Sequence, residues 1–136
     1  MNVLVAMDDS AFAAKALDQA LRLAKLETSA LYLLHVVPQP GAIDEMSPGI
    51  TDKLKASGNR LLQEAAEKIK SAGIEAKTVQ EQGISPADNV IDFAAENSID
   101  LIVMGHRGKS NLEKFLLGSV ALRVVSHAPC SVMVVK

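Results

Sequence analysis

The sequence predicts an α/β fold: a five-stranded parallel sheet in the order 3-2-1-4-5, with helices on both faces. Short apolar runs alternate along the chain with segments whose apolar residues repeat at helical spacing. Strict alternation of this kind favours a parallel sheet, because right-handed crossovers return each strand beside an earlier one. The first and fourth strands are the most continuously apolar, which suits the centre of the sheet, whereas the polar third strand suits an edge.

The first strand is the run VLVAM (3–7), which ends at Asp8 and Asp9. Ser10 is a suitable N-cap for the helix that follows. Apolar residues at helical spacing form one stripe on that helix, namely Ala13, Ala16, Leu17, Ala20, Leu21 and Ala24. We assign Asp9 to the helix start, where its charge complements the helix dipole, and Asp8 to a possible site at the strand end.

The second strand is ALYLLHVV (30–37), which Pro38 ends. The next segment, PQPGAIDEMSPG, is rich in turn residues and supports no helix or strand. A second helix is predicted from about residue 51 to 72, with Gly73 at its stop position. Its inward face comprises Leu54, Leu61, Leu62, Ala65, Ala66 and Ile69.

The run EAKTVQ (75–80) predicts the third, more polar strand. Ser85, Pro86 and Asp88 then match an N-cap, a first helical residue and a reciprocal capping partner. The third helix that they begin contains an apolar face, formed by Val90, Ile91, Phe93 and Ala94.

The last strands are LIVMG (101–105) and SVMVV (131–135), with a fourth helix predicted between them at about 119–126. The fifth strand ends the sheet on one side, and only Lys136 is available to protect its exposed edge. We therefore expect two chains to pair antiparallel through residues 131–135, forming a homodimer about a two-fold axis.

Length and composition limit the classes of function. At 136 residues, the chain suits one domain, residues 1–136. With 14 Lys and Arg against 16 Asp and Glu, and with no Trp, neither a positive field nor stacking platforms favour nucleic-acid binding. The apolar runs are too short to span a bilayer, and the N-terminus has no leader-like pattern, so we expect a cytoplasmic protein with no membrane partner.

The single cysteine, Cys130, excludes an internal disulfide and a multi-cysteine zinc site. A nucleophile paired with His127 is the alternative, but a small buried apolar residue before the last strand is the favoured interpretation. His35 and His106 show no metal-ligand spacing, so we expect no metal site made of protein side chains.

The segment GHRGKS (105–110) is similar to the end of a phosphate-binding P-loop, but its spacing is wrong. A P-loop has the form G-x-x-x-x-G-K-[ST], and the position of its first glycine is occupied here by Val103. In the predicted strand order, the first and fourth strands border a crevice at their carboxyl ends, where ligands of open α/β sheets bind. Asp8 and Gly105 lie at those two ends.

The glycines and the start of the fourth helix suit an anion in this crevice. Gly105, Gly108 and Gly118 permit positive φ and close approach of a ligand, and helix-start amides beside the Ser119 hydroxyl favour a phosphate. Arg107 and Lys109 would add positive charge. Asp8 suits ribose hydroxyls or a phosphate-bound Mg²⁺.

Each of these features also has an interpretation without a ligand. The glycines could serve turns and tight helix packing, and Arg107, Lys109 and Lys114 could form a solvated loop face. His106 is expected to be solvent-exposed at least as much as to touch a phosphate. His127 lies near the end of the fourth helix, where the negative end of the helix dipole favours a positive side chain.

The segment G105-H-R-G108-K-S-N-L-E-K-F-L-L-G118-S119 resembles the G-x2-G-x9-G-[ST] motif of the universal stress protein family, in its ATP-binding branch. VLVAMDDS, LLHVV, DLIVMGHRG and HAPCSVMVVK resemble other conserved stretches of the family, so the likeness covers nearly the whole chain. Two features depart from the family pattern. Ala6 replaces a frequent proline, and GISP (83–86) is one residue longer than the usual G-x-P.

The resemblance implies a Rossmann-like fold of the adenine nucleotide alpha hydrolase type, a homodimer, and binding of ATP, ADP or AMP. Asp8 would face the ribose, Val36 would line the adenine pocket, and the glycines with Ser119 would hold ribose and phosphates. Mg²⁺ would be held through the nucleotide phosphates. We expect these residues to contact the nucleotide: Ala6, Asp8, Val36, Met104, Gly105, Arg107, Gly108, Lys109, Gly118, Ser119 and Val120.

Three hypotheses for function remain open from the sequence. The first, which we favour, is a stress-response or signalling module that changes its surface for an unidentified protein partner when ATP binds. The second is a slow Mg²⁺-dependent ATPase, although no residue is an evident activator of water. The third is a dimeric scaffold or chaperone that works without nucleotide.

Overall fold

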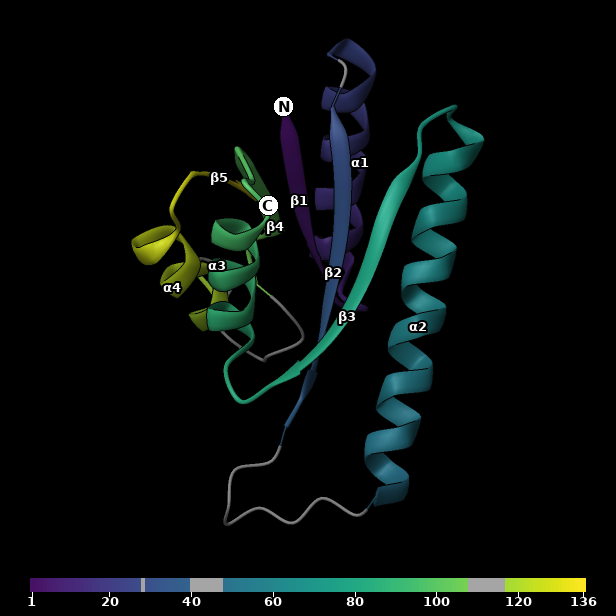
Figure 1. The fold of residues 1–136 in the computed structure, drawn as a ribbon, viewed down its shortest axis with the longest axis vertical. Coiled ribbons are helices and arrows are strands. Elements are labelled where there is room, and N and C mark those ends of the chain that lie inside the picture. Colours follow the sequence, from purple (N-terminus) through teal and green to yellow (C-terminus); the bar gives the residue numbers. More distant parts are fainter. Residues whose placement is uncertain (28, 40–47, 108–116) are drawn as a thin grey trace.

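A computed structural model describes residues 1–27, 29–39, 48–107 and 117–136, and its sheet has the predicted order. Five strands, all parallel, lie in the order β3-β2-β1-β4-β5 (Figure 1). The strands are β1 (Asn2–Met7), β2 (Ala30–Pro38), β3 (Ala76–Gly83), β4 (Leu101–Gly105) and β5 (Ser131–Val135). The helices are α1 (Ala11–Leu26), α2 (Pro48–Ser71), α3 (Pro86–Glu96) and α4 (Ser119–His127). The predicted fold class is confirmed.

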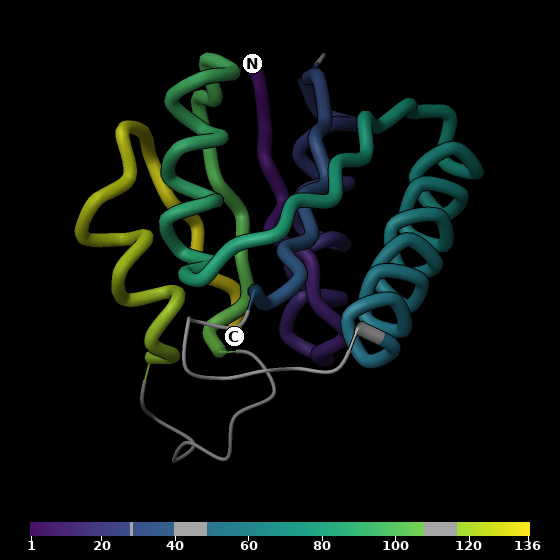
Figure 2. Tube along the Cα trace, turned by 60° about the horizontal axis from the view of Figure 1, so that its bottom comes forward, coloured from purple at the N-terminus to yellow at the C-terminus, as the bar shows by residue number. Residues whose placement is uncertain are grey.

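The core has two halves, one on each face of the sheet. Helices α1 and α2 cover one face, and α3 and α4 cover the other, as the view in Figure 2 makes plain. Side chains alternate along β1, so that Val3 and Val5 pack under α1 whereas Leu4 packs under α3. Both faces of the central strands are therefore buried, which explains why their sequences are continuously apolar.

Local capping signals determine the helix starts that the sequence predicts. The Ser10 hydroxyl accepts a hydrogen bond from the Ala13 N–H at 3.1 Å, and the Ser85 hydroxyl accepts one from the Asp88 N–H at 3.3 Å. Gly73, just past α2, has a φ of +83°, the left-handed conformation that glycine adopts without strain. All three predictions are confirmed.

Two element boundaries differ from the prediction by three residues. α2 begins at Pro48, three residues earlier than predicted. Proline is favoured at the first position of a helix, so Pro48 begins α2 and does not belong to the turn-rich segment before it. β3 continues to Gly83 rather than ending at Gln80, since its register with β2 runs on to the pair Pro38–Gly83. Pairing with a neighbouring strand overrides the weak strand preference of polar residues.

The sheet opens between β1 and β4 at their carboxyl ends. Pairing of these two strands ends at Val5–Val103. In contrast, β1 pairs with β2 as far as Met7–His35, and β4 pairs with β5 as far as Gly105–Val135. The last residues of β1 and β4 thus leave the ladder that joins them.

Among the helices that the structure describes, none has the length and apolar composition required to cross a bilayer.

Candidate functional site

A cavity of about 310 Å³ lies where β1 and β4 part. Its wall is built from the carboxyl ends of β1, β2 and β4 and from the first turns of α1, α3 and α4. This is the position at which the order of an open α/β sheet reverses and at which such sheets bind ligands.

Every predicted site residue that the structure describes lies on this wall. These nine residues are Ala6, Asp8, Val36, Met104, Gly105, Arg107, Gly118, Ser119 and Val120. They come from four segments of the chain, and the sheet topology brings them together. The other two predicted residues, Gly108 and Lys109, fall outside the described residues.

The wall also contains residues that the sequence did not indicate. They are Met7, Ser10, Ala13, Leu34, Pro86, Val90 and Ala121. One of them follows from simple periodicity, since Leu34 shares a strand face with Val36. Pro86 and Val90 could not be predicted from neighbouring residues in the sequence, because they reach the cavity through the packing of α3 over the end of β2.

The interior of the cavity is apolar and its polar groups are few. Leu34 and Val36 from β2, Val90 from α3 and Met104 from β4 form an aliphatic surface. Asp8 and Arg107 are the two charged side chains among the described lining residues. An apolar surface with a few convergent polar groups is typical of small-molecule sites.

Asp8 and Ser10 hold the turn between β1 and α1. The Asp8 carboxylate accepts a hydrogen bond from the backbone N–H of Ser10 at 2.8 Å, and Ser10 itself caps α1. Ser10 is the N-cap of α1 and Asp9 directly precedes it, so the dipole role assigned to Asp9 stays a prediction. A short carboxylate is able to bond to the amide two residues on, which gives Asp8 its fixed orientation.

The first turn of α4 presents backbone amides to the cavity. Gly118 is the N-cap and makes no side-chain capping hydrogen bond, while its own N–H donates to the His106 carbonyl at 2.9 Å. The first amides of a helix have no acceptor within the helix, and they lie at the positive end of the dipole. The wall residues Ser119, Val120 and Ala121 carry these amides.

Gly105 and Gly118 are required for packing and not for an unusual backbone conformation. Among the described glycines, positive φ occurs at Gly73 alone, so Gly105 and Gly118 do not use the positive φ that glycine permits. A Cβ at Gly105 would lie 2.6 Å from the Cβ of Phe12, and one at Gly118 would lie 3.0 Å from the Cα of Arg107. These glycines allow β4 to approach α1, and α4 to approach the segment that leaves β4.

His106 is buried, which corrects the expectation that it is exposed to solvent. Only 6% of the residue is accessible, and its ring lies 6.1 Å from that of Phe12 at a tilt of 53°. Its backbone N–H donates to the Val135 carbonyl at 2.7 Å, which continues the β4–β5 pairing by one residue. His106 therefore belongs to the packing between β4, β5 and α1.

His35 lies on the opposite face of β2 from Val36, and its polar contacts involve α2 and β3. Gln80 Nε2 lies 3.3 Å from His35 Nδ1 and donates to the Lys55 carbonyl at 3.1 Å. Burial lowers the pKa of His35, and the nearby carboxylates of Asp8 and Asp9 oppose this shift. Gly58 leaves the space that the His35 and Gln80 side chains fill.

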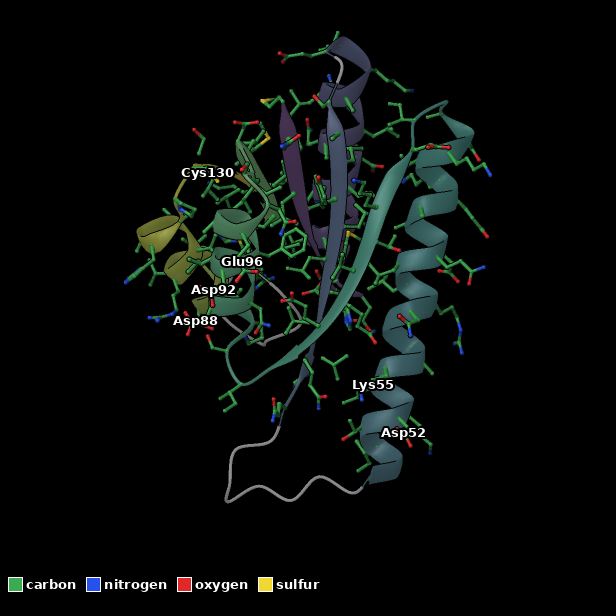
Figure 3. All side chains as sticks on the ribbon, in the orientation of Figure 1. Asp52, Lys55, Asp88, Asp92, Glu96 and Cys130 are labelled. Atoms are coloured by element: carbon green, nitrogen blue, oxygen red, sulfur yellow. The ribbon has the colours of Figure 1, made fainter. Side chains whose placement is uncertain are left out.

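The pKa values of two other side chains, Asp88 and Cys130, are shifted by contacts that serve the fold. Asp88, on α3, accepts a 2.7 Å hydrogen bond from Nε of Arg123 on α4, and this bond lowers the pKa of its carboxyl group. Figure 3 shows Asp88, Asp92 and Glu96 along α3, and Cys130 in the turn before β5. Cys130 packs against the core, and burial raises the pKa of its thiol, consistent with a structural cysteine.

Comparison with known proteins identifies relatives over the whole chain. The sequence model of the Universal stress protein family matches residues 1–136. The universal stress protein YxiE of Bacillus subtilis is 34% identical over 146 residues, which cover 99% of this chain and 98% of that protein.

Two solved structures are similar throughout. The universal stress protein UspA from Lactobacillus plantarum superposes with a TM-score of 0.87 at 28% identity, covering 100% of this chain and 97% of that one. A universal stress protein from Archaeoglobus fulgidus in complex with dAMP has a TM-score of 0.78 at 27% identity, covering 100% and 98% of the two chains.

Proposed function

Because the chain belongs to the universal stress protein family, we propose that its cavity binds an adenine nucleotide and that the protein is a nucleotide-responsive signalling module of the ATP-binding branch. The observation that supports this most strongly is a coincidence of two features in one cavity. The parted ends of β1 and β4 and the first turn of α4, whose N-cap Gly118 makes no side-chain capping hydrogen bond, border the same space.

The aliphatic part of the cavity suits the adenine base. Leu34, Val36, Val90 and Met104 offer surfaces on which a flat ring can pack, and β2 places Val36 at the carboxyl end of the sheet. A cavity of about 310 Å³ is within the range of sites that enclose a small ligand. The dAMP complex of the Archaeoglobus fulgidus relative supports this class of ligand.

The polar part of the cavity suits the ribose and the phosphates. The amides at the start of α4, the Ser119 hydroxyl and the Arg107 guanidinium are all suited to a phosphate. The Asp8 carboxylate would repel a phosphate, so it is assigned to the ribose hydroxyls. We assign the phosphates to the segment between Arg107 and Ser119, with Gly108 and Lys109 as further contacts and Mg²⁺ bound through the phosphates.

We favour binding over hydrolysis as the function of the site. Hydrolysis of ATP requires a group that orients the attacking water. Asp8 is the one carboxylate among the described lining residues, and it already accepts the Ser10 N–H. The module would act by population shift, with nucleotide binding changing a surface that a protein partner recognises.

The edge strand β5 supports a homodimer as the acting form. Val132 and Val134 share one face of β5, and Leu122 and Val125 on the neighbouring α4 are 56% and 47% exposed. Together they form a partly exposed apolar surface beside the outer edge of β5, which pairs with no other strand among the described residues and which an antiparallel copy of the same strand would cover.

Calorimetric titration with ATP, ADP, AMP and adenosine tests the proposed ligand, with GTP as the control for the base. We expect saturable binding of the adenine compounds, and thermal stabilisation that follows RT ln(1 + [L]/Kd), about 2.7 kcal/mol at a hundredfold excess over Kd. Val36→Trp should abolish binding by filling the adenine region. Val79→Trp is the matched control, because Val79 packs on the same face of the sheet but does not line the cavity.

Labelled ATP distinguishes a binding module from an ATPase. Retention of unchanged ATP supports the module, whereas steady product release that Asp8→Ala abolishes would establish the enzyme. No heat and no stabilisation at millimolar nucleotide would refute the proposed ligand and favour a scaffold that works without nucleotide.

A further inference from the structure

Phe12, in the first turn of α1, is fixed against the end of β4. At Gly105, a Cβ would lie 2.6 Å from the Phe12 Cβ and 2.9 Å from its carbonyl carbon, so the two backbones approach as closely as glycine allows. The buried ring of His106 packs 6.1 Å from the Phe12 ring. The Phe12 side chain is half-buried and therefore has a defined position beside the cavity.

Arg107 is anchored at both ends. Its Cα packs against Gly118, where a Cβ would lie only 3.0 Å away. Its guanidinium carbon lies 5.2 Å from the centroid of the Phe12 ring, within the range of a cation–π interaction. Arg107 also lines the cavity, next to the first turn of α4.

From this arrangement we infer that Phe12 is a positioning residue that holds the Arg107 guanidinium at the phosphate end of the cavity, and so raises the affinity for phosphorylated ligands over unphosphorylated ones. This inference rests on the proposed nucleotide site. Phe12 itself is absent from the wall of the cavity, so it acts through Arg107.

The physical basis is preorganisation of the Arg107 side chain, whose positive charge is unchanged by the contact with the ring. An arginine side chain loses conformational freedom when a phosphate orders it, and a side chain that is already restrained loses less. An aromatic ring restrains a guanidinium by packing on its face, and it leaves the N–H groups at the edge able to donate to phosphate oxygens.

Lys15 is an internal control for charge. Its ammonium lies 5.5 Å from the centroid of the same ring, but Lys15 is exposed and does not line the cavity. Removing Lys15 changes the net charge by the same amount as removing Arg107 and leaves the cavity wall intact.

The test compares ATP with adenosine in calorimetric titrations of wild type, Phe12→Leu, Phe12→Tyr and Lys15→Ala. Phe12→Leu should weaken ATP binding by about two- to fivefold, the equivalent of one cation–π contact, and leave adenosine binding unchanged. Phe12→Tyr retains an aromatic face and should restore the affinity for ATP. Lys15→Ala should retain the wild-type ratio of ATP to adenosine affinity.

A second measurement needs no variant. In the NMR spectrum of the wild-type protein, the side-chain protons of Arg107 should be shifted upfield by the ring current of Phe12. Absence of that shift would overturn the inference even if Phe12→Leu failed to fold.

The remaining outcomes separate this inference from the proposed function. Equal weakening of ATP and adenosine by Phe12→Leu would show that Phe12 serves the fold alone, and an unchanged ATP affinity would likewise contradict the positioning role. A wild-type protein that binds neither ligand would refute the nucleotide site itself.

Discussion

The Asp8 carboxylate accepts the backbone N–H of Ser10 at 2.8 Å, so the side chain that lines the cavity also holds the turn into α1. Half-buried at the end of β1, Asp8 combines a structural hydrogen bond with a place on the cavity wall. These two roles can be separated by substitution.

Asp8→Asn should leave the fold intact and weaken adenine nucleotide binding by roughly tenfold or more, the cost of losing a charged hydrogen-bond partner. The amide oxygen of asparagine still accepts the Ser10 N–H, so the melting temperature should change little. Calorimetric titration with AMP measures the effect. Asp9→Asn, which removes the same charge from the exposed neighbouring residue, is the control, and equal loss in both variants would argue against a specific role for Asp8.

Gly105→Ala should destabilise the protein by about 1–3 kcal/mol, because the new methyl group would overlap the Phe12 backbone and Cβ. Urea denaturation measures this change. Gly49→Ala is the matched control in α2, where a Cβ meets nothing within 4 Å, and it should be neutral or stabilising by up to about 1 kcal/mol. If Gly105→Ala were as stable as Gly49→Ala, β4 and α1 would not approach each other as closely as described.

The stability of the protein should fall as the pH drops below about 6.5, because of His35. Gln80 Nε2 is oriented by the Lys55 carbonyl, so His35 Nδ1 must accept, and protonation would place two donors face to face. The pKa of His35 in the folded state is lowered by burial, against about 6.5 in the unfolded chain. Neutral His35 therefore makes its full contribution to the free energy of unfolding when the pH is above the pKa of the unfolded chain. This contribution is lost as the pH falls through the pKa of the folded state.

His35→Asn places an amide oxygen near the position of Nδ1 and should flatten this part of the stability profile. Urea midpoints measured at several pH values provide the comparison. His127→Gln, at the exposed end of α4, should leave the His35-dependent fall in place. A His35→Asn protein with the wild-type pH profile would show that another group is responsible.

Val134→Lys should dissociate the proposed homodimer, because it places a charge on the exposed edge of β5. Val134 is half-buried in the described chain and does not belong to either core cluster, so the monomer should remain folded. Sedimentation velocity measures the oligomeric state. Leu26→Lys alters an 86% exposed side chain at the end of α1 and should remain dimeric, and a dimeric Val134→Lys protein would exclude β5 as the interface.

The parts of the fold that sequence could predict are those with local causes. The Ser10 and Ser85 caps, the stop at Gly73 and the apolar runs of β1 and β4 each depend on a few adjacent residues. The strand order then placed Asp8 and Gly105 at the same crevice, because the carboxyl ends of parallel strands meet at one edge.

The features that sequence could not predict depend on contacts between distant segments. Gly58 is buried because the side chains of His35 and Gln80, from two strands, occupy the space above it. His106 is buried by α1 and by pairing with Val135, although its neighbours in sequence suggest a polar loop. The Phe12–Arg107 contact likewise joins two segments that are nearly one hundred residues apart.

The proposed nucleotide site is tested most directly by a titration of ¹⁵N-labelled protein with ATP, followed by amide chemical shifts. If the cavity binds the nucleotide, saturable shifts are expected at Gly118, Ser119 and Val120, and at Val36 and Gly105 across the cavity, with no change at the far end of α2. Saturable shifts confined to other surfaces, or no shifts at millimolar ATP, would contradict it.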